Sequence, residues 1–391
     1  MNAYLLHHLI SKQATLRPSA LALSAKKASL NYTDLWHKTE TFARALTQLG
    51  LHKGERIGIY LDKRFETVIS AFGCSAAGCV FVPINPILKP EQVRHILHDC
   101  NVRLLVTSPE RLDSLTDILS VCPDLHHISL TVDAHAQSRL GHIKLHPWLQ
   151  TVLGETVPDR ATENDMVAIL YTSGSTGRPK GVVLSHRNMI AGARSVASYL
   201  GNHPGDRLLA ALPLSFDAGF SQLTTAFSVG AHVVLLNYLM PRDLIKAVEK
   251  WQITGLTAVP PLWIQIANQT WPESAHQHLR YIASTGGRMP RETLACLQNK
   301  LPETRVFLMY GLTEAFRATY LSPDEIDRRP NSIGKTIPNN EVLVLREDGS
   351  PCAPNEPGEL VQRGPLVAMG YWNDPERTAE RFRPLPKTLP E

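Results

Sequence analysis

The segment "RIGIYLDKRFETVISAFGCSAAGCVFVPINP" runs from Arg56 to Pro86 and decides the fold class. A short apolar run over 57–61 precedes a helical pattern over 64–77, and a second apolar run over 79–84 stops at an Asn-Pro pair. This order of strand, helix and strand is the unit of a parallel sheet. The sequence therefore predicts an α/β protein.

The same alternation continues toward the C-terminus. Residues 91–108 have the pattern of a helix and a strand, whereas residues 133–162 show no clear period. A second alternating region starts near Asp165, where an apolar strand leads to a helix that Ser185 caps and Gly201 ends.

Further segments repeat the pattern as far as residue 320. The expected strands are "RLLAALPL", "HVVLLN", "ITGLTAVP", "LRYIASTGG" and "RVFLMYG", and helices such as "PRDLIKAVEKWQ" and "PRETLACLQNKL" separate them. We expect two Rossmann-like parallel-sheet subdomains, approximately residues 1–160 and 161–320.

The pattern of the sequence changes after Glu314, from alternating strands and helices to short strands separated by turns. Residues 340–364, "NEVLVLREDGSPCAPNEPGELVQRG", alternate short apolar runs with Asp-Gly and Pro-Gly turns. Pro375 then opens a short helix. This pattern predicts a small distorted β-barrel over residues 321–391.

Composition restricts the class of protein. The 391 residues are 43% hydrophobic and 19% charged, and a net charge of +4 with both signs mixed argues against a nucleic-acid binder. No pair of the six cysteines has C-x-x-C spacing, and neither a signal peptide nor an apolar run of membrane-spanning length is present. We expect a cytoplasmic protein without a nucleic-acid or membrane partner.

The stretch "LYTSGSTGRPKGVVLSH", Leu170 to His186, has the composition of a phosphate-binding loop. Its glycines allow backbone N–H groups to converge on an anion, its hydroxyls add donors, and Lys180 adds a positive charge. It is not a Walker A loop, because the glycine spacing is too short and Gly181 follows Lys180. "SIGKT" (332–336) also fails, since Arg329 replaces the first glycine.

Several motifs together resemble the AMP-forming ligase superfamily, which includes acyl-CoA and aryl-CoA ligases, nonribosomal peptide adenylation domains and luciferases. The matching segments, in chain order, are "LNYTDLW", "AAGCVFVPINP", "YTSGSTGRPKGVVLSH", "YGLTE" and "GELVQRGPLVAMGYWNDPERTAERF". They span almost the entire chain. "YGLTEAFRATYLSP" with "RPNSIGKTIPN" is most similar to the acyl-CoA ligases associated with exosortase systems.

The resemblance implies a two-step reaction. A small-molecule carboxylate attacks the α-phosphorus of ATP, pyrophosphate leaves, and a thiol of CoA or of carrier-protein phosphopantetheine then takes the acyl group. An anion must approach a polyanion, so the protein has to neutralise charge on the triphosphate.

The resemblance also implies which residues bind the nucleotide. Lys180, Thr313 and Glu314 are the candidate catalytic residues, with Thr313 at the α-phosphate and Glu314 on Mg²⁺. The expected phosphate contacts are Thr172, Ser173, Gly174, Ser175, Thr176, Gly177 and Lys180. The expected adenine contacts are Gly286, Gly287, Arg288, Tyr310 and Gly311; an ordinary tight turn is the alternative for "STGGRMP", and relatives often have a small or acidic residue at the position of Arg288.

The segment "LPLSFDAGF" (212–220) bears on the substrate. In amino-acid-activating relatives an Asp at the position of Asp217 pairs with the α-ammonium group, so an amino acid is the favoured substrate. An Asp satisfied by backbone N–H groups or by Arg207 is the alternative. The other candidate pocket residues are Phe216, Gln222, Trp263 and Thr285, for each of which core packing is also open.

Relatives of this kind continue past "AERF" to a "TGD"-like motif, a hinge and a small C-terminal domain with a further lysine. The chain ends at Glu391 without them. We expect a large N-terminal domain alone, which binds ATP and acid but catalyses adenylation poorly. A fatty-acyl or aryl-acyl CoA ligase domain and a non-catalytic nucleotide-binding module are the alternatives.

Overall fold

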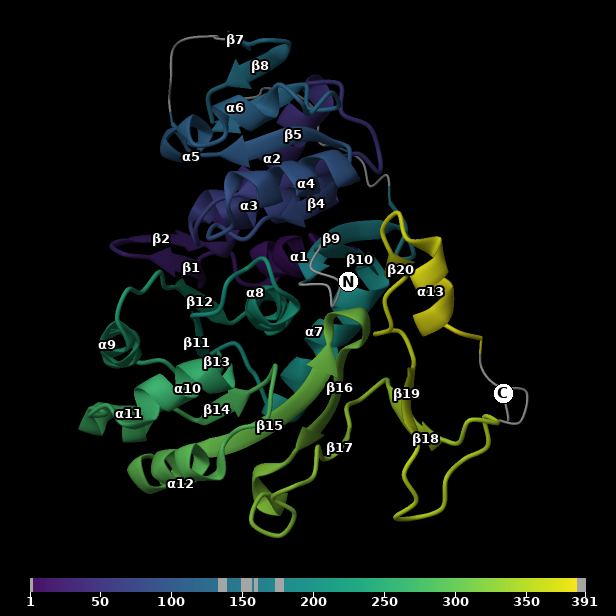
Figure 1. Ribbon diagram of the computed structural model, residues 1–391. Helices are drawn as coiled ribbons and strands as arrows, with labels where there is room; N and C mark the ends of the chain where they lie inside the picture. Colours follow the sequence, from purple (N-terminus) through teal and green to yellow (C-terminus); the bar gives the residue numbers. More distant parts are fainter. Residues whose placement is uncertain (1–2, 133–138, 149–156, 158–160, 173–178, 385–391) are drawn as a thin grey trace.

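The computed structural model describes residues 3–132, 139–148, 157, 161–172 and 179–384. Two α/β halves lie one above the other, and the last part of the chain runs along one side of both (Figure 1). The described strands form two nine-stranded sheets and one two-stranded sheet. The predicted α/β class with parallel sheets is confirmed.

The first sheet has the strand order β20-β10-β9-β4-β3-β5-β6-β8-β7. Its strands are β3 (Arg56–Tyr60), β4 (Val80–Pro83), β5 (Val102–Thr107), β6 (His127–Leu130), β7 (Arg139–Leu140), β8 (Ile143–His146), β9 (Met166–Thr172), β10 (Lys180–Ser185) and β20 (Gly370–Tyr371). The helices between them are α3 (Phe65–Ala77), α4 (Pro90–Asp99), α5 (Pro109–Asp113) and α6 (Thr116–Leu119). Its centre is parallel, whereas β7, β10 and β20 pair antiparallel at its two ends.

The second sheet has the order β17-β16-β15-β14-β13-β11-β12-β1-β2. Its strands are β1 (Leu21–Ala25), β2 (Ala28–Asn31), β11 (Arg207–Ala210), β12 (His232–Leu235), β13 (Gly255–Ala258), β14 (Tyr281–Ser284), β15 (Arg305–Leu312), β16 (Phe316–Leu321) and β17 (Lys335–Thr336). The accompanying helices are α1 (His8–Leu16), α2 (Tyr32–Gln48), α7 (His186–Leu200), α8 (Asp217–Val229), α9 (Pro241–Trp251), α10 (Pro260–Ala267), α11 (Glu273–His278), α12 (Arg291–Lys300), η1 (Thr313–Ala315) and η2 (Pro323–Glu325).

Sheet membership crosses the boundary expected near residue 160. Strands β9 and β10 follow that point but join the first sheet, and β1 and β2 precede it but join the second. Pairing between strands far apart in sequence decides which sheet a strand joins, and the local sequence pattern does not show this pairing.

The C-terminal part does not form a closed barrel within the described residues. Only β18 (Glu341–Leu345) and β19 (Glu359–Arg363) pair with each other there, as an antiparallel ribbon. The flanking strands β17 and β20 are recruited to the two large sheets, and α13 (Pro375–Arg381) follows β20. The sequence thus predicted short strands separated by turns, but it did not predict which strands these pair with.

An aromatic cluster joins the two halves. The ring of Phe220 on α8 stacks on Phe81 of β4 and on Phe72 of α3, and Phe72 meets Phe227 edge to face. All four rings are nearly fully buried, so the cluster fixes α8 against the first sheet. In the described parts of the chain no helix is both long and apolar enough to cross a membrane.

Local signals set the two helices next to the site. Ser185 caps α7 by accepting a hydrogen bond from the Asn188 backbone N–H, and Gly201 ends the helix with φ 62°, as predicted. Helix α8 starts against the preceding loop, because a Cβ on Gly219 would lie 1.7 Å from the Pro213 carbonyl oxygen. This close approach requires glycine and places Asp217 at the helix start.

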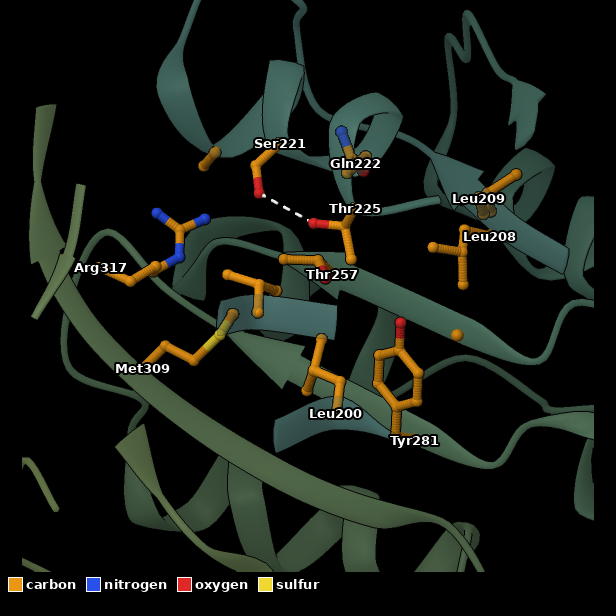
Figure 2. Close-up of a pocket in the computed structure, with 13 residues that line it drawn as sticks. Leu200, Leu208, Leu209, Ser221, Gln222, Thr225, Thr257, Tyr281, Met309 and Arg317 are labelled. Atoms are coloured by element: carbon orange, nitrogen blue, oxygen red, sulfur yellow. Dashed lines mark hydrogen bonds between the residues drawn. The ribbon is translucent and has the colours of Figure 1, made fainter. Parts of the chain in front are cut away.

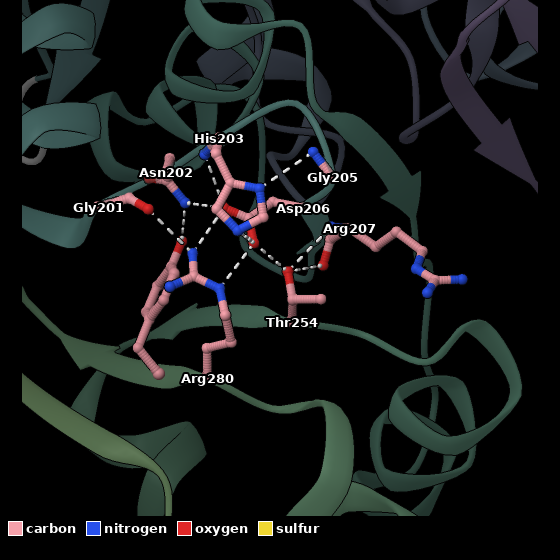
Figure 3. A network of polar contacts seen from close by, with 9 residues as sticks. Gly201, Asn202, His203, Gly205, Asp206, Arg207, Thr254 and Arg280 are labelled. Atoms are coloured by element: carbon pink, nitrogen blue, oxygen red, sulfur yellow. Dashed lines mark hydrogen bonds and ion pairs between the residues drawn. The ribbon is translucent and has the colours of Figure 1, made fainter.

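A buried polar network ties the loop before β11 to β14 (Figure 3). The carboxylate of Asp206 is fully buried and accepts hydrogen bonds from Arg280, Thr254, Asn202 and the His203 backbone. Asn202 also donates to the hydroxyl of Tyr281 at 3.0 Å. The network therefore holds the phenol of Tyr281 in place.

Stability is expected to fall in mild acid because of His232 on β12. Its Nε2 lies 2.8 Å from Ser24 Oγ, and burial lowers its pKa to about 4. A folded-state pKa below the ordinary value contributes stability above about pH 6.5 that is lost as the pH falls toward 4. At pH 5 one such histidine lowers the free energy of unfolding by about 2 kcal/mol relative to pH 7. In urea unfolding, His232→Gln should reduce the difference between pH 7 and pH 5 by about this amount; an unchanged difference would contradict the assignment.

Candidate active site

The β9–β10 hairpin holds both ends of the predicted phosphate loop. Thr172 ends β9, Lys180 begins β10, and the two residues are register partners. The Thr172 hydroxyl is buried and has no hydrogen-bond partner among the described residues. Ser173, Gly174, Ser175, Thr176 and Gly177 lie outside the described residues. The Lys180 ammonium and the Thr172 hydroxyl, two groups that suit phosphate oxygens, therefore lie at the ends of these paired strands.

Lys180, Glu314 and Tyr371 form a triangle of polar contacts. Lys180 Nζ lies 3.0 Å from Glu314 Oε1 and donates to the Tyr371 hydroxyl at 2.9 Å, while that hydroxyl donates to Glu314 Oε1 at 2.8 Å. The Ala368 backbone N–H also donates to the Glu314 carbonyl. Three elements far apart in sequence, β10, η1 and β20, thus meet at one carboxylate.

The triangle favours the charged form of both ionisable partners. Burial opposes ionisation of Glu314, but hydrogen bonds from Tyr371 and Lys180 outweigh it and lower the pKa of the carboxyl. Burial likewise acts against the Lys180 ammonium, and its bonds to Tyr371 and Glu314 outweigh this and raise its pKa. At neutral pH a cation and an anion therefore lie side by side, as a phosphate and its metal ion would require.

Tyr371 is a site residue that the sequence analysis missed. It lies within the quoted segment "MGYWNDP", and its position next to Lys180 depends on the pairing of Val182 with Tyr371 between β10 and β20. That pairing joins residues about half the length of the chain apart, so no local pattern indicated it.

A large cleft brings several predicted nucleotide residues together. Its volume is about 580 Å³, and it is lined by Lys180, Tyr310, Gly311, Glu314 and Tyr371 together with β18, β19 and α13. Gly311 allows β15 to approach β16 closely, because a Cβ there would lie 1.9 Å from the Phe316 carbonyl oxygen.

The predicted adenine turn lies beside this cleft and does not line it. Ser284 of β14 pairs with Leu308 of β15, so the following turn and Tyr310 leave the same edge of the sheet. Gly286 has φ 76°, and Gly287 faces Pro260. Arg288 is exposed and donates to Asn331 Oδ1 at 2.6 Å, away from the other candidates.

The residues fit a nucleotide that arrives with its magnesium ion. The described residues contain no group of three or more His, Cys, Asp or Glu side chains that could hold a metal alone. Glu314 supplies one carboxylate, and Mg²⁺ is commonly bound by one or two carboxylates plus substrate phosphates. The cationic Lys180 and the Thr172 hydroxyl, which has no hydrogen-bond partner within the described part of the chain, match phosphate oxygens.

A second, smaller pocket lies between α8 and the second sheet (Figure 2). Its volume is about 20 Å³, which is room for about one water molecule. Arg317 lies at one end and Tyr281 at the other, with Ser221, Gln222 and Thr225 on the α8 side and Met309 and Leu200 opposite. Ser221 Oγ and Thr225 Oγ1 lie 3.4 Å apart. Gln222 is thus the one of the predicted substrate residues that lines this pocket, and its contact with substrate stays a prediction.

Asp217 is paired, but its partner is Arg317 on β16 and not Arg207. Arg317 Nη1 lies 3.0 Å from Asp217 Oδ2, and the two side chains are 3% and 15% exposed. Thr313 Oγ1 also donates to Asp217 Oδ1 at 3.4 Å. Asp217 does not line the pocket that contains Gln222, but its contact with Thr313 places it next to Glu314 of the large cleft.

The remaining predicted pocket residues lie elsewhere. Phe216 precedes α8 and is partly exposed. Trp263 is fully buried in the core of the second half. Thr285 is also buried, and its backbone N–H donates to the Ala258 carbonyl. Neither Trp263 nor Thr285 lines the pocket that contains Gln222.

An unusual backbone conformation turns Arg317 inward. Phe316 has φ 43° and ψ −121°, a conformation that costs about 1–3 kcal/mol for a residue other than glycine. Its ring packs on α7, where a Cβ on Gly192 would lie 2.6 Å from it. The register of β15 with β16 shifts between Tyr310 and Gly311 at the same turn. Packing of Phe316 therefore stabilises a hairpin that aims Arg317 at Asp217.

The chain belongs to the family of AMP-binding enzymes, whose model matches residues 10–372. It is 26% identical over 383 residues to bacitracin synthase 3 of Bacillus licheniformis, covering 97% of this chain and 6% of that protein. It is 29% identical over 400 residues to 4-coumarate–CoA ligase 2 of Oryza sativa subsp. japonica, covering 96% and 69%. Family members activate carboxylates as adenylates for transfer to a thiol.

A solved structure agrees in fold. The complex of VinN with L-aspartate is 26% identical, with a TM-score of 0.80, and the match covers 96% of this chain and 92% of that one. The family resemblance and the fold expected from the sequence are thus confirmed. Because the chain spans only a small part of bacitracin synthase 3, the activity of that whole protein does not transfer to it.

Proposed function

We propose that this chain activates an amino acid as an aminoacyl-adenylate with release of pyrophosphate, for transfer to a thiol of CoA or of carrier-protein phosphopantetheine. The observation that carries the proposal is the contact of Thr313 with Asp217, next to the pair of Glu314 with Lys180. A buried carboxylate that suits an ammonium group thereby adjoins a cluster that suits a metal-bound triphosphate.

The charge of each side chain determines the role that we assign to it. Lys180 and the hydroxyl of Thr172 would bind phosphate oxygens and so assist departure of pyrophosphate. Glu314 would hold Mg²⁺, which supplies charge neutralisation between the phosphates. Thr313 would orient the α-phosphate toward the attacking carboxylate, while Asp217 binds the ammonium and fixes the acid for attack in line.

The comparisons support both the reaction and the substrate class. The VinN structure contains L-aspartate, an amino acid. A carrier protein is the matching partner if the acceptor is phosphopantetheine, and CoA itself is the other acceptor. The proposed roles of Gly286, Gly287, Arg288, Tyr310 and Gly311 at adenine stay predictions.

A fatty or aryl acid is the second candidate, because the pair of Asp217 with Arg317 is complete without any ligand. An acid without an ammonium group would leave that pair intact. The 4-coumarate–CoA ligase relative is consistent with this alternative.

Binding of stable adenylate analogues tests the substrate class. Alanyl, phenylalanyl and aspartyl sulfamoyl adenosines should bind by calorimetry, and Asp217→Asn should weaken the one that binds best about 10- to 100-fold, because a charge-assisted hydrogen bond contributes about 1.5–3 kcal/mol. Hexanoyl and 4-hydroxycinnamoyl analogues serve as controls whose affinity the substitution should not lower. Tighter binding of these controls in the wild type would overturn the amino-acid assignment.

A further inference from the structure

The last residue of helix α4, Asp99, makes polar contacts with two of the strands that carry the candidate site. The Tyr171 hydroxyl on β9 donates a hydrogen bond to the Asp99 carboxylate. Burial is the largest cause that raises the pKa of Tyr171 well above its ordinary value, so the phenol stays protonated and donates. The Asp99 backbone carbonyl, which the helix end leaves without an internal partner, accepts hydrogen bonds from Trp372 Nε1 at 2.8 Å and from Asn373 Nδ2 at 2.9 Å.

The contacted residues are immediate sequence neighbours of residues in the candidate site. Tyr171 precedes Thr172, and Trp372 follows Tyr371. Successive side chains on a strand point to opposite faces of the sheet. Tyr171 and Trp372 accordingly pack in the core that includes the apolar side of α4, whereas Tyr371 belongs to a different core. Helix α4 therefore supports these strands from the face opposite to the site.

A third contact of α4 reaches the start of β10. His95 Nε2 lies 3.3 Å from the carbonyl oxygen of Pro179, the residue before Lys180. Gly181, the residue after Lys180, accepts a hydrogen bond from the Trp372 backbone N–H at 2.8 Å, and a Cβ on Gly181 would lie 3.2 Å from the Trp372 side chain. Both sequence neighbours of Lys180 are therefore held by groups that belong to α4 or contact it.

This inference rests on the proposed function, in which the base of the β9–β10 hairpin binds the phosphates of ATP. We infer that Asp99 is a positioning residue of this phosphate site. Its carboxylate holds Tyr171 and thereby the end of β9 at Thr172, and its carbonyl holds Trp372 beside Tyr371. Asp99 does not line the cleft. It acts by raising the fraction of molecules in which the phosphate-binding groups are correctly placed, and the apparent affinity is proportional to that fraction.

Removing either end of the contact between Asp99 and Tyr171 tests the inference. In calorimetric titrations, Tyr171→Phe, which keeps the ring, and Asp99→Ala should each weaken the binding of Mg²⁺-ATP about 3- to 10-fold, the effect of one lost hydrogen bond. The double variant should bind no more weakly than either single variant, because both remove the same contact. AMP lacks the β- and γ-phosphates and should bind to all of these proteins with wild-type affinity.

Two further variants distinguish positioning from general stability. Asp99→Asn retains an acceptor oxygen and should restore most of the affinity for Mg²⁺-ATP. Tyr32→Phe is the matched control, because it removes another buried hydroxyl, which donates to the Ala231 carbonyl at 2.6 Å outside the hairpin. It should lower the melting temperature without changing the affinity for Mg²⁺-ATP. Thermal unfolding shows whether each variant is folded, and Tyr171→Phe with Asp99→Asn decides the test if Asp99→Ala unfolds.

The outcomes separate this inference from the proposed function. If wild-type protein binds Mg²⁺-ATP and Tyr171→Phe binds it equally well, or if the variants lose the same factor for AMP, the contact only stabilises the fold. The inference is then wrong, whereas the proposed function still stands. A loss in Asp99→Asn as large as in Asp99→Ala also contradicts the assigned role. If wild-type protein does not bind Mg²⁺-ATP, the inference and the proposed function are both overturned.

Discussion

Replacing Arg280 by alanine is expected to destabilise the protein by about 2–3 kcal/mol, because it leaves the buried Asp206 carboxylate without its counter-ion; the effect is smaller than for a fully buried pair, since Arg280 itself is 37% exposed. Its partner Asp206 has no exposed side-chain surface, and Arg280 contributes two of its hydrogen bonds, at 2.9 and 2.7 Å. Thr254, Asn202 and the His203 backbone N–H would still donate to the carboxylate, but these donors are uncharged, and the His203 imidazole, whose Nε2 lies 3.6 Å from Asp206 Oδ1, compensates the charge only when it is protonated.

The pH dependence of this variant provides an internal check. In the wild type, burial disfavours the Asp206 carboxylate, but its hydrogen bonds, led by those from Arg280, outweigh burial and lower its pKa. Without Arg280 the burial effect prevails and the pKa rises, so protonation in mild acid relieves the stranded charge. Urea unfolding should show a smaller destabilisation at pH 4.5 than at pH 7.

The matched control is Arg305→Ala on the neighbouring strand. Arg305 and its partner Asp324 are 59% and 80% exposed, with 3.6 Å between their charged atoms, so their pair should contribute at most about 1 kcal/mol. Equal destabilisation by the two substitutions would contradict the role assigned to burial.

Local sequence signals predicted where the helices and strands lie better than they predicted which strands pair with one another. The Ser185 cap, the Gly201 stop and the strand–helix–strand unit at residues 56–86 depend on neighbours in sequence, and the structure has them. The antiparallel strand β10 and the transfer of β20 to the first sheet depend on pairing across the chain. No periodicity encodes such pairing, which is why the expected barrel and the sheet boundary differ from the observed topology.

The same distinction holds in the candidate site. Lys180 and Glu314 were found from motifs, and the structure brings them within 3.0 Å. Arg317 was not found, because a single arginine between Phe316 and Ala318 on a strand has the pattern of a solvent-facing position. Its inward direction follows from the backbone at Phe316 and from the close approach at Gly311, which only the three-dimensional packing shows.

Lys180→Ala is expected to weaken the binding of Mg²⁺-ATP about 10- to 100-fold, the effect of losing a charge-assisted contact with phosphate that contributes about 1.5–3 kcal/mol. The loss arises because a cation that would contact the phosphates is removed, whereas Glu314 keeps its hydrogen bond from Tyr371. Calorimetric titration with Mg²⁺-ATP measures it. Lys335→Ala is the matched control, because Lys335 lies in the rejected "SIGKT" segment over the ring of Tyr320 and should not affect affinity.

Glu314→Gln should then separate the metal contact from the phosphate contact. Without Mg²⁺ the carboxylate repels the triphosphate and occupies Lys180, so the variant should bind free ATP more tightly than the wild type does. With Mg²⁺ the order should reverse, since the amide is a poorer ligand for a hard cation than the carboxylate. We expect Mg²⁺ to improve the affinity of the variant about tenfold less than that of the wild type, a difference of about 1.4 kcal/mol. The same gain from Mg²⁺ in both proteins would show that Glu314 does not hold the metal ion, and Lys180 would then account for the charge neutralisation at this side of the cleft.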